Sequence, residues 1–171
     1  ARGVQAANSL PLALIAPGGG WANKLYPAAR WGDVAKGLAK MALAPLVLWG
    51  PGEERLAEAV VSASGGSARR APKTSILELA ALAQASRLFL AADTGPLHIA
   101  GAFGAALVGV FGPTDPARNG PWSEDDEVVR QTPPCAPCHK RKCDLHRDIM
   151  STISVGTILE ASARRLARLP D

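Results

Sequence analysis

Three stretches rich in glycine or polar residues each follow a short apolar run, and their residue types suit the binding of a phosphate group. They are Pro17-Gly18-Gly19-Gly20, Trp49-Gly50-Pro51-Gly52-Glu53 and Ala92-Asp93-Thr94-Gly95. Glycines let a backbone approach a phosphate closely, and a helix N-terminus adds free N–H donors with a partial positive charge. Because ligands bind outside the carboxyl ends of the strands in an open parallel sheet, we expect these loops to form one site.

The segment Asp93-Thr94-Gly95 precedes a predicted helix and has two interpretations. Its backbone amides and the Thr94 hydroxyl could hold a diphosphate, or Asp93 or Thr94 could be an ordinary N-cap. The spacing favours neither. His98 lies four positions after Thr94, so on a helix it shares the face nearest this loop and could donate to a phosphate. A histidine packed in the core is the alternative.

The first glycine-rich loop lacks the Gly-Lys-Ser/Thr of a P-loop and also lacks Gly-x-Gly-x-x-Gly. It is followed by Lys24, just before the next predicted helix. A lysine in that place can act as a point charge on a phosphate, and a solvated loop lysine is the alternative.

Short apolar runs alternate with longer helical stretches, which predicts an α/β fold: a Rossmann-like parallel sheet with helices on both faces. The expected strands are 12–16, 46–49, 87–91, 106–111 and 128–130. The expected helices are 29–41, 53–62, 75–85, one through Gly101 and 153–168. Ser75 and Glu78 form a capping box at the start of the third helix. Without an internal repeat or a long linker, residues 1–171 are expected to form one domain.

The composition indicates a globular protein and excludes several classes. No apolar run approaches the stretch of about 20 residues that a spanning helix needs, and we expect no signal peptide, hence a cytoplasmic protein. The net charge is +4, but only 5% of residues are aromatic, which leaves little for base stacking, so no nucleic acid is expected. A basic surface also suits phosphorylated substrates or an anionic membrane face.

The motifs follow one another in a characteristic order: Asp93-Thr94-Gly95-Pro96-Leu97-His98, then Phe111-Gly112-Pro113-Thr114, then Gly120-Pro121-Trp122. Together with the Pro17–Gly20 loop, Lys24 and Pro27, they resemble glycosyltransferase family nine, the ADP-heptose:lipopolysaccharide heptosyltransferases. The resemblance runs from about Leu12 to Leu159. It implies the GT-B architecture, in which two Rossmann-like domains enclose the active site and the C-terminal domain binds the nucleotide-sugar donor.

The resemblance also implies roles for single residues. Lys24 would contact the donor phosphates, and Asp93 would hold the sugar or order the loop that contains it. His98 would lie behind the diphosphate site. Glu53 fits the ribose, because two acceptor oxygens match a vicinal diol, with Glu54 as the alternative. The implied donor-binding residues are Lys24, Glu53, Asp93, Thr94, Gly95, Pro96, Leu97 and His98. The family's adenine pocket falls at Pro72, Lys73 and Thr74.

The cysteine-rich segment offers four zinc ligands: Cys135, Cys138, Cys143 and His146. Their spacing is not that of a common zinc finger. The family often carries a further cysteine before a methionine here, whereas this chain has Ile149 before Met150. Cysteines without a metal are therefore favoured, and we expect neither a metal nor a cofactor.

The implied reaction transfers heptose from ADP-heptose to a lipid-linked sugar of the lipopolysaccharide inner core, with inversion. It needs a base on the acceptor hydroxyl and stabilisation of the departing diphosphate. The family's base is an aspartate of an N-terminal domain that this sequence does not contain, so we expect no catalytic residue here and little or no turnover. The enzyme is then expected to act at the inner face of the bacterial inner membrane. The alternatives are an enzyme that uses another nucleotide sugar and a non-catalytic nucleotide-binding module.

Overall fold

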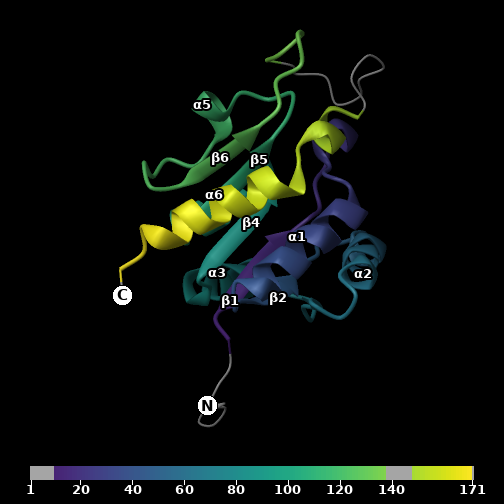
Figure 1. Ribbon diagram of the computed structural model, residues 1–171, viewed down its shortest axis with the longest axis vertical. Coiled ribbons are helices and arrows are strands. Elements are labelled where there is room, and N and C mark those ends of the chain that lie inside the picture. Colours follow the sequence, from purple (N-terminus) through teal and green to yellow (C-terminus); the bar gives the residue numbers. More distant parts are fainter. Residues whose placement is uncertain (1–9, 138–147, 171) are drawn as a thin grey trace.

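The computed structural model describes residues 10–137 and 148–170, which fold around a six-stranded sheet (Figure 1). All strand pairs are parallel, and the order is β3-β2-β1-β4-β5-β6. The predicted Rossmann-like parallel sheet is thereby confirmed. The strands are β1 (Leu12–Ala16), β2 (Ala44–Val47), β3 (Arg69–Arg70), β4 (Leu88–Ala92), β5 (Leu107–Phe111) and β6 (Glu127–Arg130).

Helices cover both faces of the sheet. The face that carries Ala13 and Ile15 of β1 packs against α1 (Ala28–Lys40), α2 (Glu54–Ala63) and α6 (Val155–Ala167). The opposite face, with Leu14 and Ala16, packs against α3 (Ile76–Ala85) and α4 (Gly95–Ala102). In Figure 1, α1 and α6 lie side by side in front of the sheet. The short helices are η1 (Ala22–Lys24), α5 (Pro116–Asn119) and η2 (Ile149–Thr152).

The predicted elements agree with the structure except at a few boundaries. The first strand has the predicted bounds, and the capping box of α3 is present, with Ser75 Oγ accepting from Glu78 N–H and Glu78 Oε2 accepting from Ser75 N–H. The second strand is shifted: β2 ends at Val47, so Leu48 and Trp49 lie beyond it. Sequence patterns did not predict β3, because Arg69 and Arg70 form a strand only by pairing with Leu46 and Val47.

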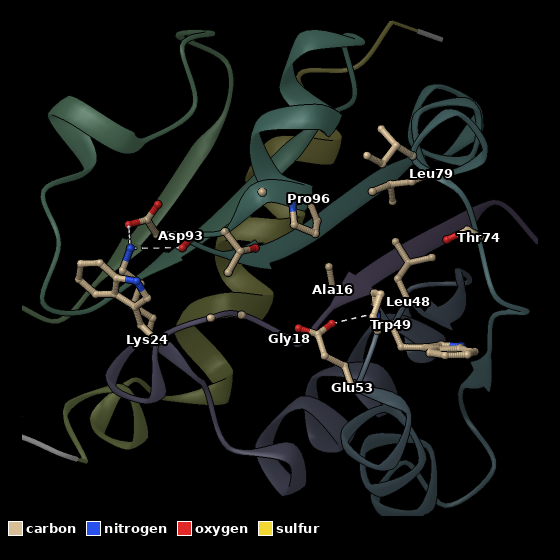
Figure 2. A pocket seen from close by; sticks show the side chains of 18 of the residues that line it. Ala16, Gly18, Lys24, Leu48, Trp49, Glu53, Thr74, Leu79, Asp93 and Pro96 are labelled. Carbon is tan, nitrogen blue, oxygen red and sulfur yellow. Dashed lines mark hydrogen bonds and ion pairs between the residues drawn. The ribbon is translucent and has the colours of Figure 1, made fainter. Parts of the chain in front are cut away.

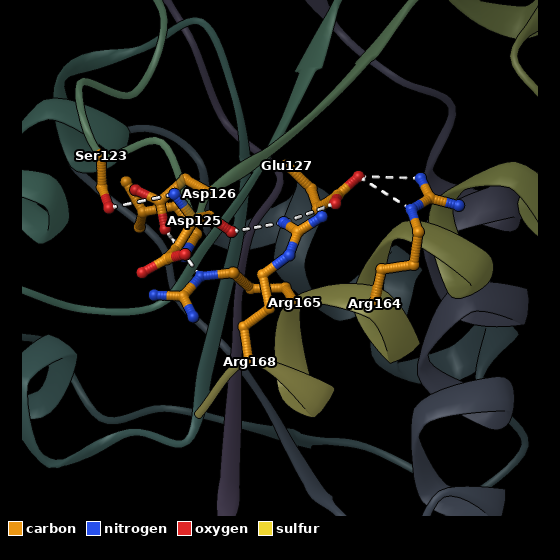
Figure 3. A network of polar contacts seen from close by, with 8 residues as sticks. Ser123, Asp125, Asp126, Glu127, Arg164, Arg165 and Arg168 are labelled. Carbon is orange, nitrogen blue, oxygen red and sulfur yellow. Dashed lines mark hydrogen bonds and ion pairs between the residues drawn. The ribbon is translucent and has the colours of Figure 1, made fainter. Parts of the chain in front are cut away.

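A polar network fastens α6 to the start of β6 (Figure 3). The Asp126 carboxylate accepts from Arg165 Nε at 2.8 Å and from the Leu107 N–H at 2.9 Å. Arg164 and Arg168 both pair with Glu127 at 2.8 Å. The hydrogen bond from Arg164, with the charges of both arginines, holds the pKa of Glu127 below its usual value against a smaller opposing effect of burial.

Among the residues that the structure describes, no helix is both long and apolar enough to cross a membrane.

Candidate functional site

A pocket of about 460 Å³ opens at the carboxyl ends of the strands (Figure 2). It lies where the chain leaves β1 toward β2 on one side and where β4 pairs with β1 on the other, which is the topological switch point of the sheet. The loops after β1, β2 and β4 and the start of α3 line it. All three loops that were predicted to form one site therefore meet here.

Lys24 and Asp93 form a sheltered ion pair at one end of the pocket. The Lys24 Nζ lies 2.6 Å from Asp93 Oδ2, and the two side chains are 12% and 5% exposed. Lys24 ends η1, and the Trp21 ring lies 4.4 Å from its ammonium, a cation–π distance. The lysine is thus held at the pocket wall rather than solvated.

The Asp93 carboxylate is charged despite its burial. Burial raises the pKa of Asp93, but the hydrogen bonds from Lys24 and Asn119, the nearby Thr114 hydroxyl and the Lys24 charge together outweigh burial and hold this pKa below its usual value. The Asn119 amide donates to Asp93 Oδ2 at 3.2 Å. The site therefore contains a fixed cation beside a fixed anion.

The N-terminus of α4 opens into the same end of the pocket. Thr94 is the N-cap residue, with extended backbone, but its hydroxyl donates to the Ala92 carbonyl at 3.2 Å. Within the described part of the chain, no side chain caps this helix. Thr94, Gly95 and Pro96 line the pocket. The ordinary side-chain cap, one of the two interpretations of this segment, is absent.

Glycines of the first loop make room for the other walls of the pocket. A Cβ on Gly18 would overlap the Glu53 carboxylate, and a Cβ on Gly19 would lie 2.7 Å from the Thr94 methyl. Glu53 Oε2 in turn accepts from the Gly50 N–H at 2.9 Å, which holds the carboxylate at the pocket wall (Figure 2). Glu54 instead points to Arg70, with which it forms an ion pair.

The far end of the pocket is mainly apolar. Leu48, Ile76 and Leu79 line it, together with Trp49, whose indole N–H donates to the Ala71 carbonyl at 2.8 Å. Of the three residues predicted to form an adenine pocket, Thr74 lines this end, whereas Pro72 and Lys73 are exposed and lie outside the lining. Sequence reasoning missed Ile76 and Leu79, which have the pattern of ordinary apolar helix positions.

Two predicted site residues face elsewhere. Leu97 is 1% exposed and packs in the core with the residues of α3 and β5. His98 lines a second pocket of about 120 Å³ beside Trp122, although its Nε2 lies 3.7 Å from Asp93 Oδ1. Because Thr94 is extended rather than helical, helical spacing from Thr94 did not place His98 in the larger pocket.

Of the four candidate zinc ligands, Cys135 is an exposed free thiol. Cys138, Cys143 and His146 lie outside the described residues. Within residues 10–137 and 148–170, no group of three or more His, Cys, Asp or Glu side chains is arranged to hold a metal ion.

Comparisons with known proteins agree on one family. The model of glycosyltransferase family 9 (heptosyltransferase) matches residues 1–148. Lipopolysaccharide heptosyltransferase 1 of Pseudomonas aeruginosa is 29% identical over 133 residues, covering 78% of this chain and 38% of that protein. Lipooligosaccharide heptosyltransferase 2 of Campylobacter jejuni is 30% identical over 81 residues, covering 46% of this chain and 25% of that protein.

Solved structures share the fold. E. coli ADP-heptose lipopolysaccharide heptosyltransferase II superposes with a TM-score of 0.80 at 19% identity, covering 96% of this chain and 49% of that one. E. coli heptosyltransferase WaaC with ADP gives a TM-score of 0.74 at 19% identity, covering 93% and 45%. This chain thus spans less than half the length of these relatives. Since the family model covers most of its residues, the chain belongs to glycosyltransferase family 9, the heptosyltransferase family.

Proposed function

We propose that this chain is the donor-binding domain of a glycosyltransferase that transfers heptose from ADP-heptose to the lipopolysaccharide inner core. The observation that carries the proposal is the pocket at the switch point of the sheet, where Lys24 and the uncapped N-terminus of α4 meet. The similar E. coli structures are an ADP-heptose lipopolysaccharide heptosyltransferase and a heptosyltransferase with ADP, which supports this donor.

The diphosphate would bind at the Lys24 end of the pocket. Lys24, the loop 18–20 and the first residues of α4 line that end. A helix N-terminus and a lysine together neutralise a diphosphate and stabilise the charge that develops on it as the sugar leaves. Asp93, beside them, would accept hydrogen bonds from the sugar hydroxyls. These groups provide leaving-group stabilisation without a metal ion.

The nucleoside would occupy the other end. Glu53 Oε2 is held by Gly50 N–H, so this carboxylate presents its remaining acceptor sites to the two ribose hydroxyls. The base would lie between Leu48, Ile76 and Leu79, with the Thr74 hydroxyl at the edge. An apolar slot with a few polar groups is the usual form of a small-ligand site.

The rest of the reaction would take place with a second domain. The base that deprotonates the acceptor hydroxyl, and the site for the lipid-linked acceptor, are proposed to belong to an N-terminal domain of the same enzyme. Residues 1–171 are then one donor domain, at the cytoplasmic face of the inner membrane where such an acceptor is held. The basic surface, with a net charge of +4, favours this location.

Calorimetric titration of the chain with ADP-heptose, ADP, UDP-N-acetylglucosamine and GDP-mannose tests the donor class. We expect ADP-heptose to bind most tightly and ADP next. The uridine and guanosine compounds should bind at least about tenfold more weakly, because their bases differ from adenine in shape and hydrogen bonding. Tighter binding of the uridine or guanosine sugar would show that ADP-heptose is not the donor. Donor binding without transfer, once the N-terminal half of a family member is supplied, would favour a non-catalytic module.

Glu53→Ala and Gly18→Ala are expected to lower the affinity for ADP by the same amount, about three- to tenfold. The first variant removes the carboxylate and the second displaces it, since a Cβ on Gly18 overlaps it. The double variant should bind no more weakly than either single one, because both act on one contact. Glu54→Ala is the matched control and should bind like the wild type. Additive losses in the double variant would argue against the ribose role.

A further inference from the structure

Asn119 is a polar side chain in direct contact with the predicted sugar-binding carboxylate. Its Nδ2 donates to Asp93 Oδ2 at 3.2 Å, and Lys24 Nζ lies 2.6 Å from the same oxygen. The two donors come from segments far apart in the sequence: Lys24 ends η1, before α1, and Asn119 ends α5. Asp93 therefore has one charged partner and one neutral partner on a single oxygen.

Hydrogen bonds within the short helix α5 hold Asn119 in place. The helix α5 has only four residues and is capped by Asp115, whose Oδ1 accepts from the Ala117 N–H at 3.1 Å. Gly120 ends it with a hydrogen bond from its N–H to the Pro116 carbonyl at 2.7 Å, where a Cβ would overlap that carbonyl. The turn Asp115–Gly120 thus aims Asn119 at Asp93.

The two partners of Asp93 respond differently to a diphosphate. Lys24 is a cation and is attracted by the phosphate charges, so its hydrogen bonding is shared between the phosphate and Asp93 once a donor binds. The neutral amide of Asn119 gains nothing comparable from a phosphate and stays with Asp93. A carboxylate accepts about four hydrogen bonds, so Asp93 keeps acceptor sites for sugar hydroxyls while Asn119 holds its orientation.

We propose that Asn119 is a positioning residue that fixes the Asp93 carboxylate toward the sugar of the donor. This inference rests on the proposed function, because it needs a nucleotide sugar whose glycosyl part reaches Asp93. It differs from the phosphate and ribose contacts in one measurable respect. Asn119 matters for ADP-heptose, which carries the sugar, and not for ADP, which lacks it.

The test compares the affinities of ADP and ADP-heptose in wild type, Asn119→Ala and Arg118→Ala by calorimetry. For Asn119→Ala we expect ADP binding within about twofold of wild type and ADP-heptose binding about three- to tenfold weaker, the worth of one lost hydrogen bond. Arg118→Ala alters the neighbouring exposed residue of the same short helix and should leave both affinities unchanged. Equal losses for both ligands, or no loss for either, would overturn the role of Asn119.

Asn119→Asp preserves the shape but places a second carboxylate beside Asp93. His98 Nε2 lies 3.7 Å from Asp93 Oδ1 and Lys24 pairs with Oδ2, so each affinity is compared with wild type at the same pH. Relative to wild type, ADP-heptose affinity should fall at about pH 7.5 and recover in part at about pH 5.5, where one shared proton restores a donor between the two carboxyl groups. ADP affinity should stay close to that of wild type at both pH values, because ADP lacks the sugar. A fall and recovery of the same size for ADP would indicate a purely structural role, and no recovery for ADP-heptose would count against the proposal. Failure of the wild-type chain to bind any ADP compound would overturn the proposed function and this inference together, whereas binding with an unchanged ratio overturns only the inference.

Discussion

Asp126→Asn is expected to lower the free energy of unfolding by about 3–5 kcal/mol, measured by urea denaturation followed by circular dichroism. Asp126 and Arg165 are 4% and 9% exposed, and their atoms lie 2.8 Å apart. The asparagine can still accept the Leu107 N–H, so the variant removes mainly the negative charge. The guanidinium of Arg165 then lies buried without its anion, and burial of an unpaired charge is the costly part.

A second variant separates this cause from general damage to the fold. Adding Arg165→Met to Asp126→Asn removes the stranded cation and should recover much of the lost stability. Arg164→Ala is the surface control. Arg164 forms an ion pair with Glu127, and its side chain is 51% exposed. Loss of this exposed ion pair should change stability far less. If the double variant is as unstable as Asp126→Asn alone, the ion pair is not what joins α6 to the sheet.

Lys24→Gln is expected to weaken ADP binding about 10- to 100-fold, the worth of a charged hydrogen bond to a phosphate. Glutamine keeps an amide that can donate to Asp93, so that carboxylate retains a partner and the variant folds. Without the ammonium, the pKa of Asp93 should rise relative to wild type, because hydrogen bonding and charge from Lys24 are among the causes that hold it down. Calorimetry measures the affinity, and carbon-13 NMR of the Asp93 carboxyl measures its titration.

Lys36→Ala provides the matched loss of a lysine at a distance. Lys36 is exposed and pairs with Asp33 on α1, so its removal should leave ADP affinity unchanged. An equal loss in both variants would indicate long-range charge attraction instead of a contact. Unchanged affinity in Lys24→Gln would remove Lys24 from the phosphate site.

Local patterns sufficed for most of the fold. The strand Leu12–Ala16 is a short apolar run stopped by Pro17, and the Ser75–Glu78 box is complete within four residues. The strand Arg69–Arg70 was missed because it has two charged residues and exists only through pairing with β2. The end of β2 was misplaced, since Leu48 and Trp49 are as apolar as a strand but line a pocket.

The candidate site was predictable where one loop carried the signal. Lys24, Glu53 and Asp93 each follow a strand in a polar or glycine-rich loop, and the structure brings all three to one pocket. Partners from distant segments were not predictable. Asn119 lies 26 residues from Asp93 along the chain, and nothing in its own neighbourhood indicates that it turns toward that carboxylate. The direction of each side chain at the start of α4 depends on the extended backbone of Thr94, which spacing alone does not reveal.

The two ends of the pocket are borne by different strands, and this separation bears on how the family can diversify. The loops after β1 and β4 form the Lys24–Asp93 end, whereas the loop after β2 and the start of α3 form the apolar end. Each loop is anchored at its own strand, so replacements at Leu48, Ile76 or Leu79 alter one end without rebuilding the other. In the proposed binding mode, such replacements change the nucleobase end of the pocket and leave the proposed diphosphate end intact.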